Sequence, residues 1–211
     1  KRTIEDHFTT DQNFLKNFKK NDRFRNDLEK FYSMLNMSKI FWINQQKPKG
    51  FGDAVLYSES FVGSDDFLVS AGDTLILNND KIIKKMIDVE LKEKNDALLV
   101  LKKVTNPKRF GVAVIKETQN KIQITNVEEK PVKPKSNLSI VALYRFKPSI
   151  FKALREIKHG NKELQLTDVI QKLIEWGGNV QAILLDEEMT VIDVGTAESY
   201  LESLQNYQNN Q

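Results

Sequence analysis

The sequence predicts a single mixed α/β domain with a mostly parallel central sheet flanked by helices. Short continuous apolar runs, typical of strands buried on both faces, alternate with amphipathic helical stretches in the first half of the chain. The second half shows a hairpin pattern and further short strands. The chain has 211 residues, of which 40% are hydrophobic and 29% are charged, so one sizeable core needs no disulfide support.

The first half shows helices and strands in alternation. Residues 1–36 are polar and predicted to be helical, and their apolar residues at helical spacing are Leu28, Phe31, Tyr32 and Leu35. Buried strands are expected at residues 40–43, 67–70 and 97–101. Helices are expected at residues 53–60 and from Asn79–Asp80 onward, the second with apolar residues Ile82, Ile83, Met86, Ile87 and Leu91. Strands alternating with helices indicate parallel neighbours.

The second half adds a hairpin and three further strands. The hairpin is expected at residues 110–124, with its turn near Gln119–Asn120, and strands are expected at residues 140–146, 180–185 and 190–194. One helix should start at Pro148 and end at Gly160, and another should run from Thr167 to Gly177–Gly178. Thr196 should cap a final helix.

The final helix carries an apolar stripe of Tyr200, Leu201 and Leu204. This stripe could serve an interface in a homo-oligomer, but packing against the parent domain is the interpretation we favour. Oligomeric state therefore stays open at the level of sequence.

Composition excludes several classes of function. The net charge is +3 and basic residues are interspersed with acidic ones, which argues against a nucleic-acid partner but allows a local phosphate site. The absence of cysteine excludes disulfides, thiolate catalysis and Cys-ligated zinc. No apolar run approaches membrane-spanning length and no signal-peptide pattern opens the chain, so we expect a cytoplasmic protein without a membrane partner.

Polar residues follow several of the predicted strands. In open α/β sheets, ligands bind beyond the carboxyl ends of the strands, where the strand order reverses. The residues placed there or directly after the hairpin are Asn44, Gln45, Asp73, Glu129, Lys130 and Asp193. Each alone also fits a plain structural role, such as a turn, a helix cap or a solvated surface position. The glycines of the segment “QQKPKGFGDAVL” (residues 45–56) are likewise only a weak phosphate signal.

Taken together, the segments are more specific than any one of them. Seven occur in this order: “KRTIEDHF”, “QQKPKGFGDAVL”, “VSAGDTLI”, “RFGVAVI”, “VEEKPVKPKSNLSIVALYRF”, “KELQLTDVI” and “VIDVGTAESYLESL”. This series resembles the sugar-phosphate nucleotidyltransferases, most closely the bacterial and archaeal type of UTP–glucose-1-phosphate uridylyltransferase. The resemblance extends from Lys1 to about Leu204 and implies a Rossmann-like nucleotidyltransferase fold, with a small β-hairpin region in the sugar-binding half.

The resemblance also implies a nucleotide site and a metal site. Gln45 would contact the uracil edge, because an amide donates and accepts hydrogen bonds together, and Gly50 would let the backbone approach the base. Asp73 and Asp193 would be the metal-binding pair for Mg²⁺, the expected cofactor, since magnesium takes few carboxylates along with phosphate oxygens and water.

On the sugar side, the resemblance assigns three roles and two further positions. Gly111 would line the sugar pocket, Glu129 would bind sugar hydroxyls, and Lys130 would hold the sugar-1-phosphate. Asn137 and Glu163 fall on further motif positions near the sugar. The catalytic set expected from the resemblance is therefore Lys130, Asp73 and Asp193.

The implied reaction needs no protein nucleophile. A phosphate oxygen of glucose-1-phosphate attacks the α-phosphorus of UTP in line and pyrophosphate leaves, so positioning and electrostatic stabilisation dominate. The small-molecule partners expected are UTP and glucose-1-phosphate. Two alternatives stay open: a thymidylyl- or guanylyltransferase acting on a related sugar phosphate, and a nucleotide-sugar-binding module without turnover.

The sequence departs from the family pattern in three places. The family's glycine-rich, arginine-containing loop and the catalytic lysine that follows it have no counterpart, and the helix start at Lys1 predicts an N-terminally truncated chain. An isolated chain of this kind should be poorly stable, or complemented by another copy or fragment. Ala142 replaces a common glycine, which would narrow the sugar pocket, and Asp53 differs from some relatives without a physical account.

The expected organisation is one nucleotidyltransferase domain over residues 1–211. Residues 1–103 would be the remainder of the nucleotide-binding half and residues 104–196 the sugar-phosphate-binding half. Residues 197–211 would form the C-terminal helix and polar tail.

Overall fold

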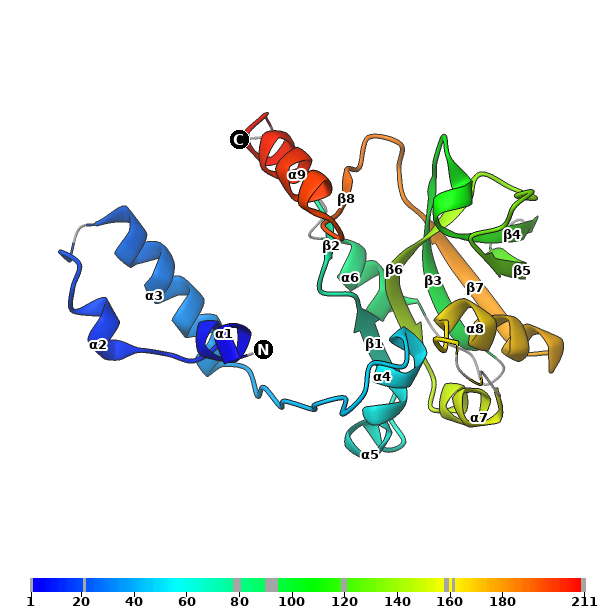
Figure 1. Ribbon diagram of the computed structural model, residues 1–211, viewed down its shortest axis with the longest axis horizontal. Coiled ribbons are helices and arrows are strands. Elements are labelled where there is room, and N and C mark those ends of the chain that lie inside the picture. Colours follow the sequence, from blue (N-terminus) through cyan, green and yellow to red (C-terminus); the bar gives the residue numbers. More distant parts are fainter. Residues whose placement is uncertain are drawn as a thin grey trace. The chain divides into compact units, whose positions relative to one another are not determined.

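The computed structural model describes residues 2–20, 22–77, 81–89, 95–118, 121–157, 160 and 162–209 (Figure 1). The chain divides into two compact units, Lys1–Gln46 and Lys47–Gln211. The prediction of a single domain over the whole chain stays a prediction. Among the described residues, no helix is long and apolar enough to cross a membrane.

The first unit is helical, as the sequence predicted. Its helices are α1 (Arg2–His7), α2 (Gln12–Leu15) and α3 (Arg23–Asn36). The Asp11 carboxylate accepts hydrogen bonds from two backbone N–H groups of α2, and Asp22 caps α3 by accepting one from Phe24. These caps satisfy donors that the first turn of a helix leaves unpaired, so the two aspartates fix where α2 and α3 begin.

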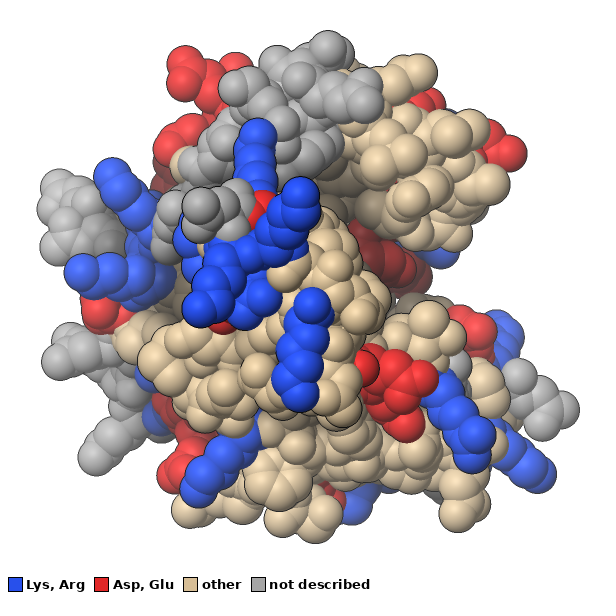
Figure 2. Space-filling view, turned by 90° about the vertical axis from the view of Figure 1, so that its left-hand side faces the viewer, with Lys and Arg blue, Asp and Glu red and all other residues tan. Residues whose placement is uncertain are grey.

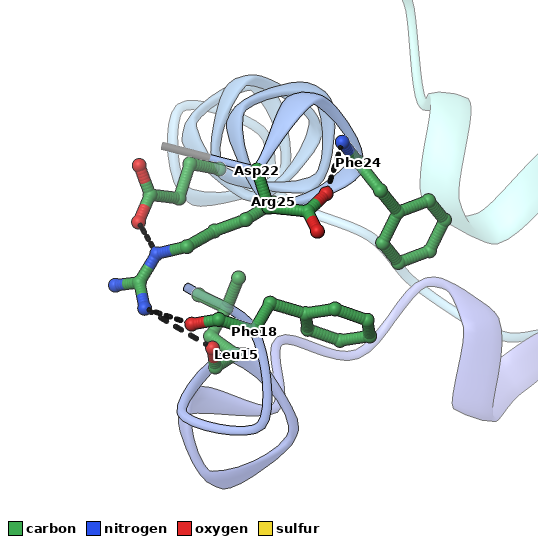
Figure 3. A network of polar contacts seen from close by, with 6 residues as sticks. Leu15, Phe18, Asp22, Phe24 and Arg25 are labelled. Atoms are coloured by element: carbon green, nitrogen blue, oxygen red, sulfur yellow. Dashed lines mark hydrogen bonds and ion pairs between the residues drawn. The ribbon is translucent and has the colours of Figure 1, made fainter. Parts of the chain in front are cut away.

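The side chain of Arg25, in the first turn of α3, joins α3 to the C-terminal end of α2 (Figure 3). Its Nη1 donates to the carbonyl oxygens of Leu15 and Phe18, at 3.2 and 3.0 Å, and its Nε donates to Glu29 at 2.8 Å. The Phe18 ring lies 5.0 Å from the Phe24 ring, centroid to centroid. Arg25 thus satisfies carbonyls at the end of α2 from within α3.

The buried strand expected at residues 40–43 is not formed. These residues have no regular secondary structure, and their apolar side chains are 41–60% exposed. A strand buried on both faces needs a neighbour to pair its backbone, and no described strand pairs with this segment. The prediction was therefore wrong, because the local apolar pattern carries no information about the partner strand.

The second unit is built on a six-stranded sheet with strand order β1-β6-β3-β7-β5-β4. The strands are β1 (Phe67–Ser70), β3 (Asn95–Lys103), β4 (Gly111–Thr118), β5 (Lys121–Glu129), β6 (Leu138–Phe146) and β7 (Asn179–Leu184). The hairpin predicted from the sequence is confirmed as β4–β5, while its turn at Gln119–Asn120 lies outside the described residues.

The sheet is mixed, as predicted, but its parallel character needs a correction. Strands β1, β3, β4 and β7 run in one direction and β5 and β6 in the other, so the shared direction of most strands is confirmed. Among the described pairings, however, only β3–β7 is parallel. The reason is that β6 lies antiparallel between β1 and β3, so that Phe146 pairs with both Phe67 and Ala97.

A second sheet has two short strands, β2 (Thr74–Ile76) and β8 (Val191–Asp193). The sequence predicted β8 but not β2, which is only three residues long. The two strands are antiparallel, and Thr74 is in register with Asp193. This pairing brings the segment after β1 against the segment near the end of the chain.

Helices cover both faces of the six-stranded sheet (Figure 1). The helices of this unit are α4 (Phe51–Tyr57), α5 (Glu59–Val62), α6 (Lys81–Asp88), α7 (Ser149–Glu156), α8 (Leu166–Glu175) and α9 (Ala197–Asn209), with a 3-10 turn η1 (Pro107–Arg109). α4, α7 and α8 pack on one face in the larger core cluster, and α6 packs on the other in a smaller one. Most predicted helices are confirmed, although α7 ends at Glu156 and not at Gly160. The predicted start at Asn79–Asp80 and the residue Leu91 lie outside the described residues.

The C-terminal helix α9 is capped as expected, because the Thr196 hydroxyl accepts from the backbone N–H of Ser199 at 3.1 Å. Its stripe does not pack on the described part of the unit: Tyr200, Leu201 and Leu204 are 44–61% exposed. The packing that we favoured from the sequence is therefore not observed.

Charged side chains of both signs occupy the face drawn in Figure 2. Blue Lys and Arg side chains gather near its centre, and red Asp and Glu side chains lie among them and around them. This mixture agrees with the small net charge of +3.

Candidate active site

The second unit contains a cleft of about 790 Å³. It lies where β1 and β3 end, where β6 begins, and beside the small β2–β8 sheet. Its charged lining residues are Asp73, Lys102, Glu129, Lys130 and Asp193. The cleft therefore combines three carboxylates with two ammonium groups at the carboxyl ends of the strands, which is the position that open α/β sheets use for ligands.

Asp73 and Asp193 are brought together by the β2–β8 pairing. Thr74, the residue after Asp73, pairs in register with Asp193, and the Val194 N–H donates to the Asp73 carbonyl at 2.8 Å. Both aspartates are exposed and line the cleft. Two residues that are 120 positions apart in the chain thus present carboxylates to one cavity, as the strand-end rule predicted.

These carboxylates are a suitable donor set for magnesium. Mg²⁺ prefers oxygen ligands and is commonly held by one or two carboxylates, the rest of its shell being water and substrate phosphate. Within the described part of the chain, no group of three or more Asp, Glu, His or Cys side chains forms a ready-made metal cage. The pair formed by Asp73 and Asp193 therefore fits a metal that is completed by a phosphate ligand.

Glu129 and Lys130 line the cleft at the end of β5. The Lys130 Nζ is 4.0 Å from the Glu129 carboxylate, and the lysine side chain is 66% exposed. Lys130 has a φ of 42°, the left-handed region that non-glycine residues rarely adopt, and its N–H donates to the Phe110 carbonyl at 3.1 Å. Such local strain is typical of positions held in place for function.

A smaller pocket of about 230 Å³ opens beside Glu129 and shares six lining residues with the large cleft. Its further polar lining residues are Arg109, Tyr144, Gln165 and Thr167. The Thr167 hydroxyl, at the start of α8, donates to Glu129 Oε2 at 2.8 Å. This bond engages Oε2, while Oε1, which lies 4.0 Å from Lys130 Nζ, can accept from a ligand.

Gly111 borders this pocket at a position that has no room for a side chain. A Cβ added there would lie 2.7 Å from Thr167 Cγ2 and 3.1 Å from Glu129 Oε2. Any side chain would therefore displace the Thr167–Glu129 pair. Gly111 lines the smaller pocket, and the role in sugar binding that the resemblance implies for it stays a prediction.

Tyr144 contributes a neutral hydroxyl to the same pocket. Burial raises the pKa of its phenol well above the usual range, and the negative charge of Glu129 raises that pKa further. The phenol therefore stays protonated at all physiological pH values.

Four predicted site residues do not line the two cavities. Gln45 belongs to the first unit and is half-buried. Gly50 precedes α4 with a φ of 103°, and a Cβ there would lie 2.7 Å from the Leu164 backbone, so this glycine serves close packing. Asn137 is exposed and its carbonyl accepts from the Val104 N–H at 2.9 Å. The roles suggested for these residues stay predictions.

Glu163 is the fourth residue outside the cavities. Its side chain is exposed, and its Oε2 accepts from Gln165 Nε2 at 3.3 Å. Since Gln165 lines the smaller pocket, Glu163 is one hydrogen bond removed from that pocket.

Sequence reasoning missed Lys102, Arg109 and Thr167. Lys102 directly follows the predicted strand at residues 97–101, so the strand-end rule could have identified it. Thr167 was interpreted only as a helix start, and its contact with Glu129 joins residues 38 positions apart, for which the sequence offers no signal.

The family model described as nucleotidyl transferase matches residues 9–210. A UTP–glucose-1-phosphate uridylyltransferase from Mycoplasma genitalium is 32% identical over 212 residues, covering 96% of this chain and 70% of that protein. A glucose-1-phosphate thymidylyltransferase from Streptomyces griseus is 34% identical over 148 residues, covering 70% of this chain. The chain spans only about 40% of the length of that Streptomyces protein.

The fold is also that of a solved relative. An apo UDP-glucose pyrophosphorylase superposes with a TM-score of 0.88 at 24% sequence identity, covering 99% of this chain and 78% of that one. The predicted nucleotidyltransferase fold is thereby confirmed. With a family model matched over nearly its whole length and a relative matched over 96% of its residues, the chain belongs to the nucleotidyl transferase family.

Proposed function

We propose that this chain carries out nucleotidyl transfer from UTP to glucose-1-phosphate, which forms UDP-glucose and pyrophosphate. A phosphate oxygen of the sugar phosphate forms a bond to the α-phosphorus of UTP, and the bond from that phosphorus to the β-phosphate oxygen breaks. Pyrophosphate leaves with the electron pair. The observation that carries the proposal is that Asp73, Asp193, Glu129 and Lys130 all line one cleft.

The residues of the cleft fit the charges of this reaction. Lys130 would hold the attacking phosphate as a point charge, and the aspartate pair would hold Mg²⁺. When bound, the metal supplies positive charge to the phosphoryl oxygens. The acceleration would come from positioning and electrostatic stabilisation, for which the protein needs no nucleophile of its own.

The smaller pocket fits the sugar. Glu129 would accept hydrogen bonds from sugar hydroxyls with the oxygen that Thr167 does not use, and Gly111 leaves the space in which the ring would lie. We place Asn137 and Glu163 near the sugar on the strength of their motif positions alone.

For the base, we propose Gln45 and Gly50, which occupy the corresponding motif positions. The amide of Gln45 can donate and accept hydrogen bonds at the same time, as the imide edge of a pyrimidine requires.

A second candidate is thymidylyl transfer, which the name of the Streptomyces griseus relative favours. Uracil and thymine differ by one methyl group. A difference of one methyl group in an apolar contact typically discriminates by only about 10- to 200-fold. The two activities are therefore separated by measurement and not by inspection of the cleft.

The test is magnesium-dependent pyrophosphate release by the 211-residue chain. UTP, dTTP and GTP are each paired with glucose-1-phosphate and mannose-1-phosphate, and binding of UDP-glucose is measured by calorimetry alongside. We expect turnover with UTP and glucose-1-phosphate. Faster turnover with dTTP would move the proposal to thymidylyl transfer. Binding of UDP-glucose without any turnover would indicate a nucleotide-sugar-binding module. If the chain shows no binding of UDP-glucose and no turnover, the proposal is overturned.

A further inference from the structure

Lys102 is a basic residue of the large cleft to which sequence reasoning gave no role. It lies near the carboxyl end of β3, in register with the buried Ser139 of β6, which also lines the cleft. Its side chain is half-buried, and its Nζ donates to the carbonyl oxygen of Met189. The ammonium is therefore fixed at the wall of the cleft, not free in solvent.

One hydrogen bond leaves this ammonium with two further donors. Lys102 has no carboxylate partner among the described residues. A half-buried charge beside a cleft is stabilised by an anion that enters the cleft, since the partly desolvated site strengthens the attraction. Lys102 is thus a candidate contact for a negatively charged ligand.

The position of Lys102 separates it from Lys130. Lys130 lines both the large cleft and the smaller pocket, whereas Lys102 lines only the large cleft. An anionic group attached to the sugar would lie within reach of Lys130. Lys102 does not line the smaller pocket, so we assign it to an anion other than the one attached to the sugar.

We propose that Lys102 binds the phosphates of the nucleoside triphosphate that leave as pyrophosphate. This inference rests on the proposed function and adds a residue to it. The cleft is lined by three carboxylates and two ammonium groups, so the phosphate chain requires cationic partners. Because Lys130 is assigned to the sugar phosphate, Lys102 is the lysine of the cleft that can contact the leaving group. Lys102 stabilises the charge that develops there as the bond to the α-phosphorus breaks.

The next residue in the chain is a matched control. Lys103 points to the opposite face of β3, and its Nζ forms an ion pair with Glu187 at 3.2 Å. Glu187 and Met189 belong to the same connection between β7 and β8, so both lysines tie this connection to β3. Only Lys102 lines the cleft. The two lysines therefore separate a role in holding the connection from a role in binding an anion.

The experiment measures binding of inorganic pyrophosphate to the 211-residue chain by calorimetry, in magnesium buffer. The variants are Lys102→Met, Lys102→Arg and Lys103→Met; methionine keeps the aliphatic length of the side chain and removes its charge. We expect Lys102→Met to weaken pyrophosphate binding about tenfold or more, because a charge-assisted hydrogen bond is lost. Lys103→Met should change it less than about twofold, and Lys102→Arg should recover part of the loss.

A second readout separates binding from stability. In steady-state kinetics, Lys102→Met should raise KM for UTP and, in the reverse direction, for pyrophosphate. KM for glucose-1-phosphate should stay within about twofold of the wild-type value. Equal losses in Lys102→Met and Lys103→Met would overturn the inference in favour of a structural tie, as would a wild-type chain that does not bind pyrophosphate.

Failure of the proposed function gives a different result. In that case pyrophosphate binding would still depend on Lys102 and not on Lys103, but no pairing of nucleotide and sugar phosphate would give turnover. If turnover occurs and Lys102→Met leaves both pyrophosphate binding and KM for UTP unchanged, the function stands and the inference fails.

Discussion

The Thr167 hydroxyl donates a hydrogen bond of 2.8 Å to the Glu129 carboxylate, across the smaller pocket of the site. The pair joins the first turn of α8 to the end of β5. It holds the carboxylate in one orientation, and its position depends on the absence of a side chain at Gly111.

Gly111→Ala should disturb this pair. The new Cβ would lie 2.7 Å from Thr167 Cγ2, closer than Cβ atoms come to other heavy atoms in proteins. We expect a rise of about tenfold or more in KM for glucose-1-phosphate, with KM for UTP within about twofold, as measured by pyrophosphate release.

The double variant Gly111→Ala with Thr167→Ser provides the control. Serine keeps the hydroxyl that bonds to Glu129 and removes the Cγ2 that the alanine would strike. It should therefore restore much of the loss seen in Gly111→Ala alone, which is a coupling that a double-mutant cycle measures. An additive result would show that the clash with Thr167 is not the cause.

The aspartate pair leads to a second prediction. Asp73→Asn and Asp193→Asn should each lower kcat by roughly 10²-fold or more, because each removes a negative ligand from the proposed magnesium site. Higher magnesium concentrations should recover part of the activity. Asp65→Asn is the matched control, since Asp65 is exposed, lies outside the cleft and undergoes the same change of charge. Near-normal activity in either cleft variant would remove that residue from the metal site.

Asp73 and Asp193 also show what the sequence can predict. Both follow short apolar segments, and the rule that ligands bind beyond the ends of strands identified them without knowledge of any contact. Strand β1 and the hairpin β4–β5 were predicted for the same reason, because their patterns are local.

What the sequence could not provide was the identity of each strand's partner. The apolar run at residues 40–43 has the pattern of a buried strand but pairs with no described strand, and β6 lies unforeseen between β1 and β3. Strand β2 has only three residues and exists through its pairing with β8, far along the chain. Contacts between distant residues, such as Thr167 and Glu129, are invisible to patterns of local periodicity.

A third prediction concerns a buried amide in the sheet. Gln181 of β7 is 6% exposed, and its Nε2 has no hydrogen-bond partner among the described residues. A buried polar group without a partner typically destabilises a fold by about 1–3 kcal/mol. Gln181→Leu should therefore raise the free energy of unfolding by about 1 kcal/mol or more, measured by urea denaturation.

Gln123 of β5 serves as the control for this substitution. It is in register with Gln181 but is exposed, so Gln123→Leu should change the free energy of unfolding by less than about 0.5 kcal/mol. A loss of stability in Gln181→Leu would mean that the amide is satisfied, for example by water.

The last prediction concerns the first unit, where one guanidinium joins two helices. Arg25 is 20% exposed at its side chain and donates to Leu15, Phe18 and Glu29. Arg25→Ala removes the donor to the Phe18 carbonyl and one of two donors to the Leu15 carbonyl, which also accepts from the Phe18 N–H, and it removes the ion pair with Glu29. Because the site is partly open to water, we expect a loss of only about 1–2 kcal/mol.

Hydrogen exchange of the full chain, resolved by segment, measures this loss where it occurs. Amides of α2 and α3 should exchange about five- to thirtyfold faster in Arg25→Ala, while amides of β3 keep their rates, since β3 belongs to the other unit. Arg23→Ala is the matched control: Arg23 is exposed, lies on the same helix, and makes no side-chain hydrogen bond to the described residues. Equal acceleration in both variants would show that α3 responds to the loss of any arginine, and that the bonds of Arg25 to α2 do not hold the two helices together.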